Sequence, residues 1–204
     1  MKATKLFNLY SGLLIFSGLL FFNTVNLHAQ SFNEGSIAVN GGIGILSSIN
    51  YYAGYTIKRT PVISVSAEYG VKKIGPGILG LGLAFGYQSA SYTDNAGSYY
   101  YKDKWTTTLF GLRGTYHPDF LNTDKYDVYG VLQLSFDHFG YSFTTNDPYI
   151  NSNLYGQNTL SSYVRPYFLL GGRYYVSKNF GVFSELGYDI SYLKLGITLK
   201  FDKK

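Results

Sequence analysis

The chain of 204 residues has no cysteine, one tryptophan and few charged side chains, which make up 14% of the total. The absence of cysteine excludes disulfides and a lipid anchor attached through cysteine. Beyond the first 30 residues, no segment approaches the continuous apolar run that a membrane-spanning helix needs. The formal net charge of +5 is mild and scattered, so it does not indicate a nucleic-acid-binding protein.

The N-terminus predicts a secretory signal. Lys2 and Lys5 precede an apolar stretch within residues 13–22, and Ala29 is the small residue at the expected cleavage point. We therefore expect residues 1–29 to be a cleaved signal peptide and residues 30–204 to form one domain with a net charge of +3. The alternative, a short N-terminal anchor helix, is disfavoured because the apolar stretch is short and no lysine or arginine follows it closely.

The end of the chain alternates strictly between two kinds of side chain. In residues 192–201 one face carries Leu193, Leu195, Ile197, Leu199 and Phe201, and the other carries Lys194, Gly196, Thr198 and Lys200. A period of two with one purely apolar face and one small or charged face is typical of a strand between lipid and a polar lumen. A soluble barrel would place the large aliphatic side chains inward.

The same alternation predicts seven further strands. They cover residues 35–47, 60–71, 79–88, 105–116, 126–136, 163–176 and 180–188. An even number of antiparallel strands can close into a barrel, which leaves no unpaired edge for lipid to meet. The expected fold class is all-β, an eight-stranded antiparallel transmembrane up-and-down β-barrel.

Longer and shorter connections alternate between these strands. Segments 48–59, 89–104 and 138–162 are long and polar, so we expect them to be external loops, and the short segments 72–77, 117–125 and 177–179 to be periplasmic turns. The chain is rich in tyrosine (22) and phenylalanine (15), as the aromatic girdles of such barrels require.

Several motifs resemble small eight-stranded outer-membrane barrels of the OmpA/OmpX-like, "porin family" group. They are Gly111–His117, Pro166-Tyr167, Gly171–Tyr175, Ser177–Phe183, Glu185–Tyr188 and Tyr192–Gly196 with the final Phe201. The resemblance implies a monomer in the bacterial outer membrane, surrounded by outer-membrane lipid and inserted with the help of periplasmic chaperones and the barrel-assembly machinery. It also implies that Phe201 is the C-terminal insertion signal, although Asp202 and two lysines follow it.

The inward faces carry a set of charged side chains. They are Glu68, Arg113, Asp137, Arg165, Arg173, Glu185 and Lys194. Because an unpaired charge in a confined lumen is costly, these groups should pair. Arg173 and Glu185 flank the 177–179 turn on adjacent strands, so we predict a pair between them, with Arg113 and Glu68 as further members. The network is interpreted as structural packing, and the alternative is a gate that re-pairs to pass ions.

No catalytic residue, cofactor or metal site is predicted. His117, beside Pro118, is expected to be exposed or interfacial at a periplasmic turn. His138 is the only plausible base, but Asp137 points to the opposite face, and neither Ser135 nor Ser142 is held near it. The chain is therefore not expected to be an enzyme.

The leading functional hypothesis is a structural or surface-interaction role through the external loops. Tyr99-Tyr100-Tyr101 and the Tyr/Asn-rich segment 141–163 have a composition suited to binding another surface, here an unidentified ligand, or to forming an interfacial aromatic belt. The alternatives are a narrow, gated pore for ions or very small solutes and, less favoured, a lipid-modifying enzyme. A wide pore is disfavoured because side chains fill the interior of an eight-stranded barrel.

Overall fold

Nine strands form one antiparallel sheet in the computed structural model, which describes residues 31–47, 57–151 and 160–202. The strands are β1 (Ile37–Ser47), β2 (Lys58–Arg59), β3 (Val62–Lys73), β4 (Gly77–Ala96), β5 (Tyr99–Pro118), β6 (Tyr126–Thr145), β7 (Leu160–Tyr175), β8 (Phe180–Tyr188) and β9 (Ser191–Phe201). A single 3₁₀ turn, η1 (Asp119–Leu121), follows β5. No helix in the described part of the chain has the length and hydropathy of a membrane span.

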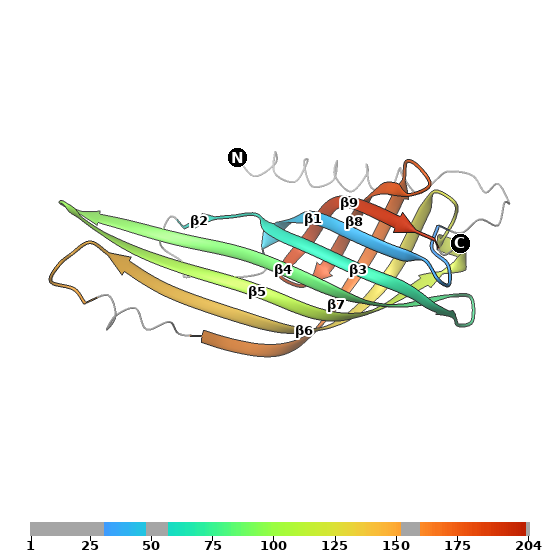
Figure 1. Cartoon of the computed structure of the whole chain (residues 1–204), viewed down its shortest axis with the longest axis horizontal. Helices are drawn as coiled ribbons and strands as arrows, with labels where there is room; N and C mark the ends of the chain where they lie inside the picture. Colours follow the sequence, from blue (N-terminus) through green and yellow to red (C-terminus); the bar gives the residue numbers. More distant parts are fainter. Residues whose placement is uncertain (1–30, 48–56, 152–159, 203–204) are drawn as a thin grey trace, which may run out of the picture.

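The sheet closes on itself. Neighbouring strands of the ring follow the chain order, and the ring is completed by β1, which pairs with β9 from Ile37 opposite Phe201 to Ser47 opposite Ser191. The two-residue β2 pairs only with β4, ahead of β3, so that eight strands make up the barrel (Figure 1). The predicted eight-stranded antiparallel barrel is confirmed.

Large apolar side chains cover the outside of the barrel. Leu83 is 62% exposed and Leu112 is 65% exposed, whereas the polar Glu68 and Glu185 are buried inside. The outer belt includes Ile63, Val65, Leu81, Phe85, Phe110, Leu132, Leu134, Phe136, Phe168, Leu170, Leu186, Ile197 and Leu199, all exposed. Only a hydrocarbon surrounding makes such a belt favourable, because a patch of this size would associate in water. The fold is therefore a transmembrane barrel with the predicted facing of its strands.

Three strands continue far beyond the belt. β4, β5 and β6 each have 20 residues, and they project together from one end of the barrel (Figure 1). The predicted external loop 89–104 is therefore wrong, since these residues form a long hairpin whose turn is Gly97-Ser98, with Gly97 at φ 63°. Residues 138–145 also belong to a strand rather than a loop. Threonine and tyrosine, which favour strands, extend the pairing here although the apolar alternation has ended.

Other expectations concern residues outside the described part of the chain. The predicted signal peptide (1–29), most of the predicted loop 48–59 and residues 152–159 belong to this category. The domain boundary at residue 30 therefore stays a prediction.

Candidate functional site

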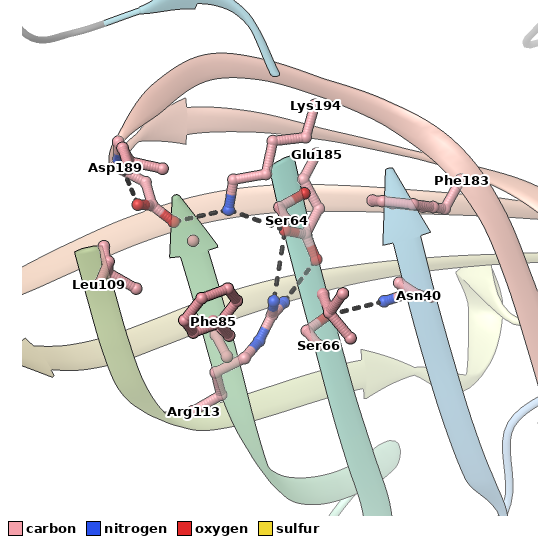
Figure 2. Close-up of a pocket in the computed structure, with 14 residues that line it drawn as sticks. Asn40, Ser64, Ser66, Phe85, Leu109, Arg113, Phe183, Glu185, Asp189 and Lys194 are labelled. Atoms are coloured by element: carbon pink, nitrogen blue, oxygen red, sulfur yellow. Dashed lines mark hydrogen bonds and ion pairs between the residues drawn. The ribbon is translucent and has the colours of Figure 1, made fainter. Parts of the chain in front are cut away.

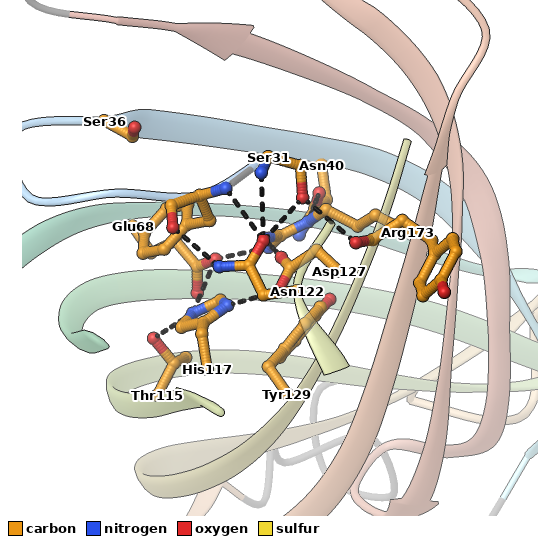
Figure 3. A network of polar contacts seen from close by, with 12 residues as sticks. Ser31, Ser36, Asn40, Glu68, Thr115, His117, Asn122, Asp127, Tyr129 and Arg173 are labelled. Carbon is orange, nitrogen blue, oxygen red and sulfur yellow. Dashed lines mark hydrogen bonds and ion pairs between the residues drawn. The ribbon is translucent and has the colours of Figure 1, made fainter. Parts of the chain in front are cut away.

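The predicted lumen charges lie on the inner side of the barrel wall. Six of the seven are almost fully buried, with relative exposures between 1% and 4%: Glu68, Arg113, Asp137, Arg173, Glu185 and Lys194. Arg165 differs, because its side chain is 43% exposed at the outer mouth. Five of the buried groups belong to two networks, which Figures 2 and 3 show in turn and which Tyr129 connects, whereas Asp137 bonds Tyr167 instead.

The first network is centred on Glu185 (Figure 2). Its carboxylate accepts hydrogen bonds from Arg113 at 2.5 and 3.3 Å and from the Tyr129 hydroxyl at 3.0 Å. Lys194 lies 3.5 Å from the same carboxylate and 2.6 Å from Asp189. Two cations thus face two carboxylates, so this network is neutral as a whole.

The second network is centred on Arg173, nearer the end of the barrel where the chain enters β1 (Figure 3). The guanidinium lies 2.5 Å from Glu68 and 2.9 Å from Asp127, and its Nε donates to Asn40 at 3.1 Å. It also lies over the ring of Tyr129, 4.2 Å from the centroid. This buried cation is therefore held by two carboxylates, one amide oxygen and one π-face.

His117 belongs to the second network. The expectation of an exposed or interfacial histidine is wrong, because the residue is 0% exposed. Its Nδ1 lies 2.8 Å from Asp127 and its Nε2 lies 3.0 Å from Thr115. The cause is that β5 continues to Pro118, so His117 still alternates with outward-facing Tyr116 and points into the lumen.

The N-terminal residues close the same end of the barrel. Phe32 is fully buried, and its ring stacks on His117 with centroids 4.0 Å apart. The side chain of Asn122 binds this segment, since it donates to the Phe32 carbonyl at 2.7 Å and accepts from the amides of Ser31 and Phe32 at 3.0 and 3.2 Å. The segment after the predicted cleavage point therefore plugs the lumen.

The predicted pair between Arg173 and Glu185 is wrong in its partners. Arg173 lies opposite Phe183 on β8, and Glu185 lies opposite Gly171 on β7, so the two residues are staggered by two positions. Glu185 instead reaches across the lumen to Arg113, and Arg173 reaches Glu68. Long side chains in a narrow barrel bridge strands that are not neighbours. Positions counted from the turn between two strands predict only contacts between those two strands.

Sequence reasoning missed two carboxylates that complete the networks, Asp127 and Asp189. Asp127 shares the parity of the inward-facing Gln133 and Asp137 on β6, so extending the alternation to the start of the strand would have found it. Asp189 has the parity of Glu185 but lies beyond the end of β8, in the connection to β9, where the alternation of a strand no longer indicates the facing of a side chain.

Packing leaves almost no free volume around these networks. A Cβ added to Gly171 would lie 2.2 Å from the ring of Tyr129, so only glycine permits this tyrosine to cross the lumen. The cavity between Asn40, Arg113, Glu185 and Lys194 has a volume of about 10 Å³, which is room for about one water molecule. Side chains of the described residues thus fill most of the lumen around these networks.

At the outer mouth, Arg165 is stacked between aromatic rings. Its guanidinium lies 5.0 Å from the ring centroid of Tyr163 and 5.6 Å from that of Phe139. Asp137, 3.9 Å from Arg165, accepts a hydrogen bond from the Tyr167 hydroxyl. This exposed cation is the one predicted lumen charge that an external molecule can reach.

The ends of β4, β5 and β6 that extend beyond the belt form a projecting sheet, and aromatic and acidic side chains lie on its side toward the barrel axis. On the side toward the barrel axis, Trp105 packs near Tyr141, with ring centroids 5.8 Å apart. The Tyr141 hydroxyl donates to Asp103 at 2.5 Å, and burial together with this hydrogen bond raises the pKa of Tyr141 to about 12. The hydroxyl of Tyr101 donates to Asp147 at 2.7 Å, and this hydrogen bond is the main reason that its pKa is raised.

His138 lies on the outer side of β6. Its Nδ1 is 3.0 Å from the Ser162 hydroxyl on β7, and its ring is stacked on Phe136. Asp137 points inward, as predicted, and no carboxylate among the described residues contacts the His138 ring. This pair has no acid to orient the histidine. The described residues also include no cluster of three or more histidine or acidic side chains that could hold a metal ion.

Phe201 lies on the outer face of β9, opposite Ile37, and is 52% exposed. This is the lipid-facing position that the alternation predicts for it. Its role as an insertion signal stays a prediction.

No protein-family model matches the chain, and no curated protein matches it. Two solved structures of similar shape are Ail, the attachment invasion locus protein of Yersinia pestis, in complex with the heparin analogue sucrose octasulfate, and the N-terminal β-barrel domain of OprF from Pseudomonas aeruginosa. Ail is 14% identical with a TM-score of 0.46, and the match covers 82% of this chain and 99% of Ail. OprF is 16% identical with a TM-score of 0.45, and the match covers 82% of this chain and 98% of that domain. The architecture itself rests on the strand register of this chain, which is that of an eight-stranded transmembrane β-barrel.

Proposed function

We propose that the protein is a monomeric bacterial outer-membrane barrel whose projecting sheet, formed by the ends of β4, β5 and β6, acts in contact with other molecules at the cell surface. The observation that carries this proposal is the continuation of three paired strands beyond the apolar belt. Pairing keeps this sheet rigid, so a partner would bind it with little loss of conformational freedom. The aromatic inner side of the sheet, with Trp105 and Tyr141, supplies the residue types that dominate binding surfaces.

The closed lumen supports a structural barrel rather than a pore. An ion path along the axis would require the Arg113–Glu185 and Arg173–Glu68 contacts to open together, and Phe32 would have to leave its buried position. Separating a buried ion pair costs several kcal/mol unless water replaces the lost partner, so spontaneous opening would be rare. We expect the purified protein in a planar bilayer to be silent. Discrete openings that change in Glu185→Gln would favour the gated pore.

Surface labelling tests the location and the orientation. The chain contains no cysteine, so Ser98→Cys at the tip of the β4–β5 hairpin and Ser177→Cys at the β7–β8 turn each provide a unique label. A membrane-impermeant maleimide should label Ser98→Cys on intact cells and Ser177→Cys only after the outer membrane is opened. The reverse pattern would invert the orientation, and labelling of neither on opened cells would contradict an outer-membrane location.

Trimming tests the surface role. Replacing residues 91–104 by a two-residue turn shortens the hairpin but leaves the belt and both charge networks intact. We expect this variant to fold, to migrate faster without boiling than after boiling, and to lose any binding of the wild-type barrel to other cells or to surface proteins. Unchanged binding would move the surface role away from the projecting sheet. Biogenesis through periplasmic chaperones and the barrel-assembly machinery is part of the same proposal.

A further inference from the structure

The outer side of the projecting sheet is positively charged, and its inner side holds the acids. In the register of β4, β5 and β6, Lys104 lies opposite Ser91 and Ser142, and Lys102 lies opposite Thr93 and Thr144. Lys58 of β2 lies on the other side of Ser91, so it belongs to the same outward row as Lys104. The acids of these strand ends, Asp94 and Asp103, have the opposite parity and face the barrel axis.

The three lysines form a compact and unneutralised group. Lys102 and Lys104 are two residues apart on one strand, about 7 Å, and Lys58 lies two strands from Lys104, about 10 Å away. All three are exposed, and no carboxylate among the described residues forms an ion pair with any of them. Such a spacing suits two phosphate groups on one molecule better than a single carboxylate.

An apolar groove lies further down the same outer surface, where Phe110 in its lining is six residues from Lys104 on β5, roughly 20 Å along the strand. It has a volume of about 520 Å³, within the range of roughly 300–1,000 Å³ that is typical of ligand sites. Its exposed lining includes Leu83, Phe85, Phe110, Leu112, Leu134, Phe136 and Val164. Hydroxyl groups and a histidine lie between the groove and the lysines: Thr106, Thr108, His138 and Ser162 occupy the rows in between.

Along the strands, from the apolar belt toward the tip of the β4–β5 hairpin, the outer surface therefore changes from apolar to neutral polar to cationic. Lys104 lies four residues beyond Thr108 on β5, about 10 Å further out along a tilted strand, and a lysine side chain can reach back toward a headgroup. A lipid has the same order of chemistry, from acyl chain through ester to charged headgroup.

We propose that this surface binds one phosphorylated lipid of the outer leaflet, with acyl chains in the groove and phosphates at Lys58, Lys102 and Lys104. Charge complementarity selects this occupant, because the described residues of this face include lysines and no acid. A second copy of the chain would place lysines against lysines. The inference rests on the proposed location and orientation, which the cysteine labelling tests separately.

The experiment is native mass spectrometry of the folded full-length barrel in detergent, titrated with lipid A that carries two phosphates, with dephosphorylated lipid A as the comparison. We expect the phosphorylated lipid to bind at least tenfold more tightly. The variant K102S/K104S should weaken its binding roughly 10- to 30-fold, since each lysine near an anionic headgroup contributes about 1 kcal/mol. Serine is chosen as the replacement because it already occupies positions 91 and 142, which lie opposite Lys104 on the neighbouring strands.

The matched control is K72S/K178S, which removes two exposed lysines at the opposite end of the barrel and changes the net charge equally. It should bind the phosphorylated lipid as the wild type does. Faster migration of the unboiled protein shows that each variant is folded. Equal weakening in both variants, equal affinity for both lipids, or a lipid-independent dimer that covers the groove would each overturn the inference, even if labelling supports the outer-membrane location.

Discussion

Replacing Glu185 by glutamine is the sharpest test of the lumen network. The substitution keeps the size and shape of the side chain but removes the charge that faces Arg113 at 2.5 Å and Lys194 at 3.5 Å. Asp189 can then neutralise only one of the two buried cations. Removing one partner of a buried ion pair costs about 3–5 kcal/mol, so we expect the free energy of unfolding to fall by that amount.

The assay is equilibrium unfolding by urea in lipid vesicles, followed by the fluorescence of the single tryptophan, Trp105, and by migration of unboiled samples. The control is Glu34→Gln, which neutralises an exposed acid outside the barrel and should change stability by no more than about 0.5 kcal/mol. A double-mutant cycle isolates the pair: Arg113→Met combined with Glu185→Gln should cost at least about 2 kcal/mol less than the sum of the single changes. Additive effects, or a Glu185→Gln variant within about 1 kcal/mol of the wild type, would refute the idea that the pair holds the barrel together.

Three further predictions address the belt, the N-terminal plug and the projecting sheet. Leu83→Arg, on the lipid face, should lower the free energy of unfolding in vesicles by about 2–4 kcal/mol. Ser91→Arg, on the same face of the same strand but beyond the belt, should lower it by less than about 1 kcal/mol. Equal costs would contradict the placement of the belt. Phe32→Ala should cost about 3–5 kcal/mol because it empties a fully buried site, and Phe120→Ala, 75% exposed, should be nearly neutral; a harmless Phe32→Ala would mean that the plug does not contribute to stability. The raised pKa of Tyr141 favours its protonated form in the folded state, so the stability from its hydrogen bond is complete below about pH 10 and is lost as the pH rises through about 12. Tyr141→Phe should reduce the phenolate absorbance that appears near pH 12 by the amount of one tyrosine, and an unchanged amplitude would contradict the raised pKa of Tyr141.

The barrel was predictable because one physical rule governs nearly all of its wall. A strand between lipid and lumen must carry apolar side chains on its lipid face. This rule produces the alternation of side chains that located β1, β3, β8 and β9 to within a few residues. The rule no longer applies where both sides of a strand meet water. The sequence of residues 89–104 therefore predicts a polar loop, although the backbones of β4 and β5 stay paired there.

The lumen partners were less predictable than the lumen residues. Alternation places Arg173 and Glu185 on the inner face, but it contains no information on which strands meet across the lumen. That depends on the stagger of the strands and on side-chain length, which together bring Arg173 to Glu68 and Asp127. His117 was misplaced for a related reason, because proline at position 118 suggested that the strand had already ended.

The pairing of β1 with β9 has a consequence for how the protein folds. The two strands that complete the ring are separated by more than 140 residues of chain, so their contacts can form only after the rest of the sheet is in place. Until then both strands present unpaired edges, which promote aggregation in water. Gly42 lies opposite Gly196 in this seam, so one pair of residues in the middle of it contributes no side-chain contact between the strands. Closure of the seam should therefore be the slow and vulnerable step of folding.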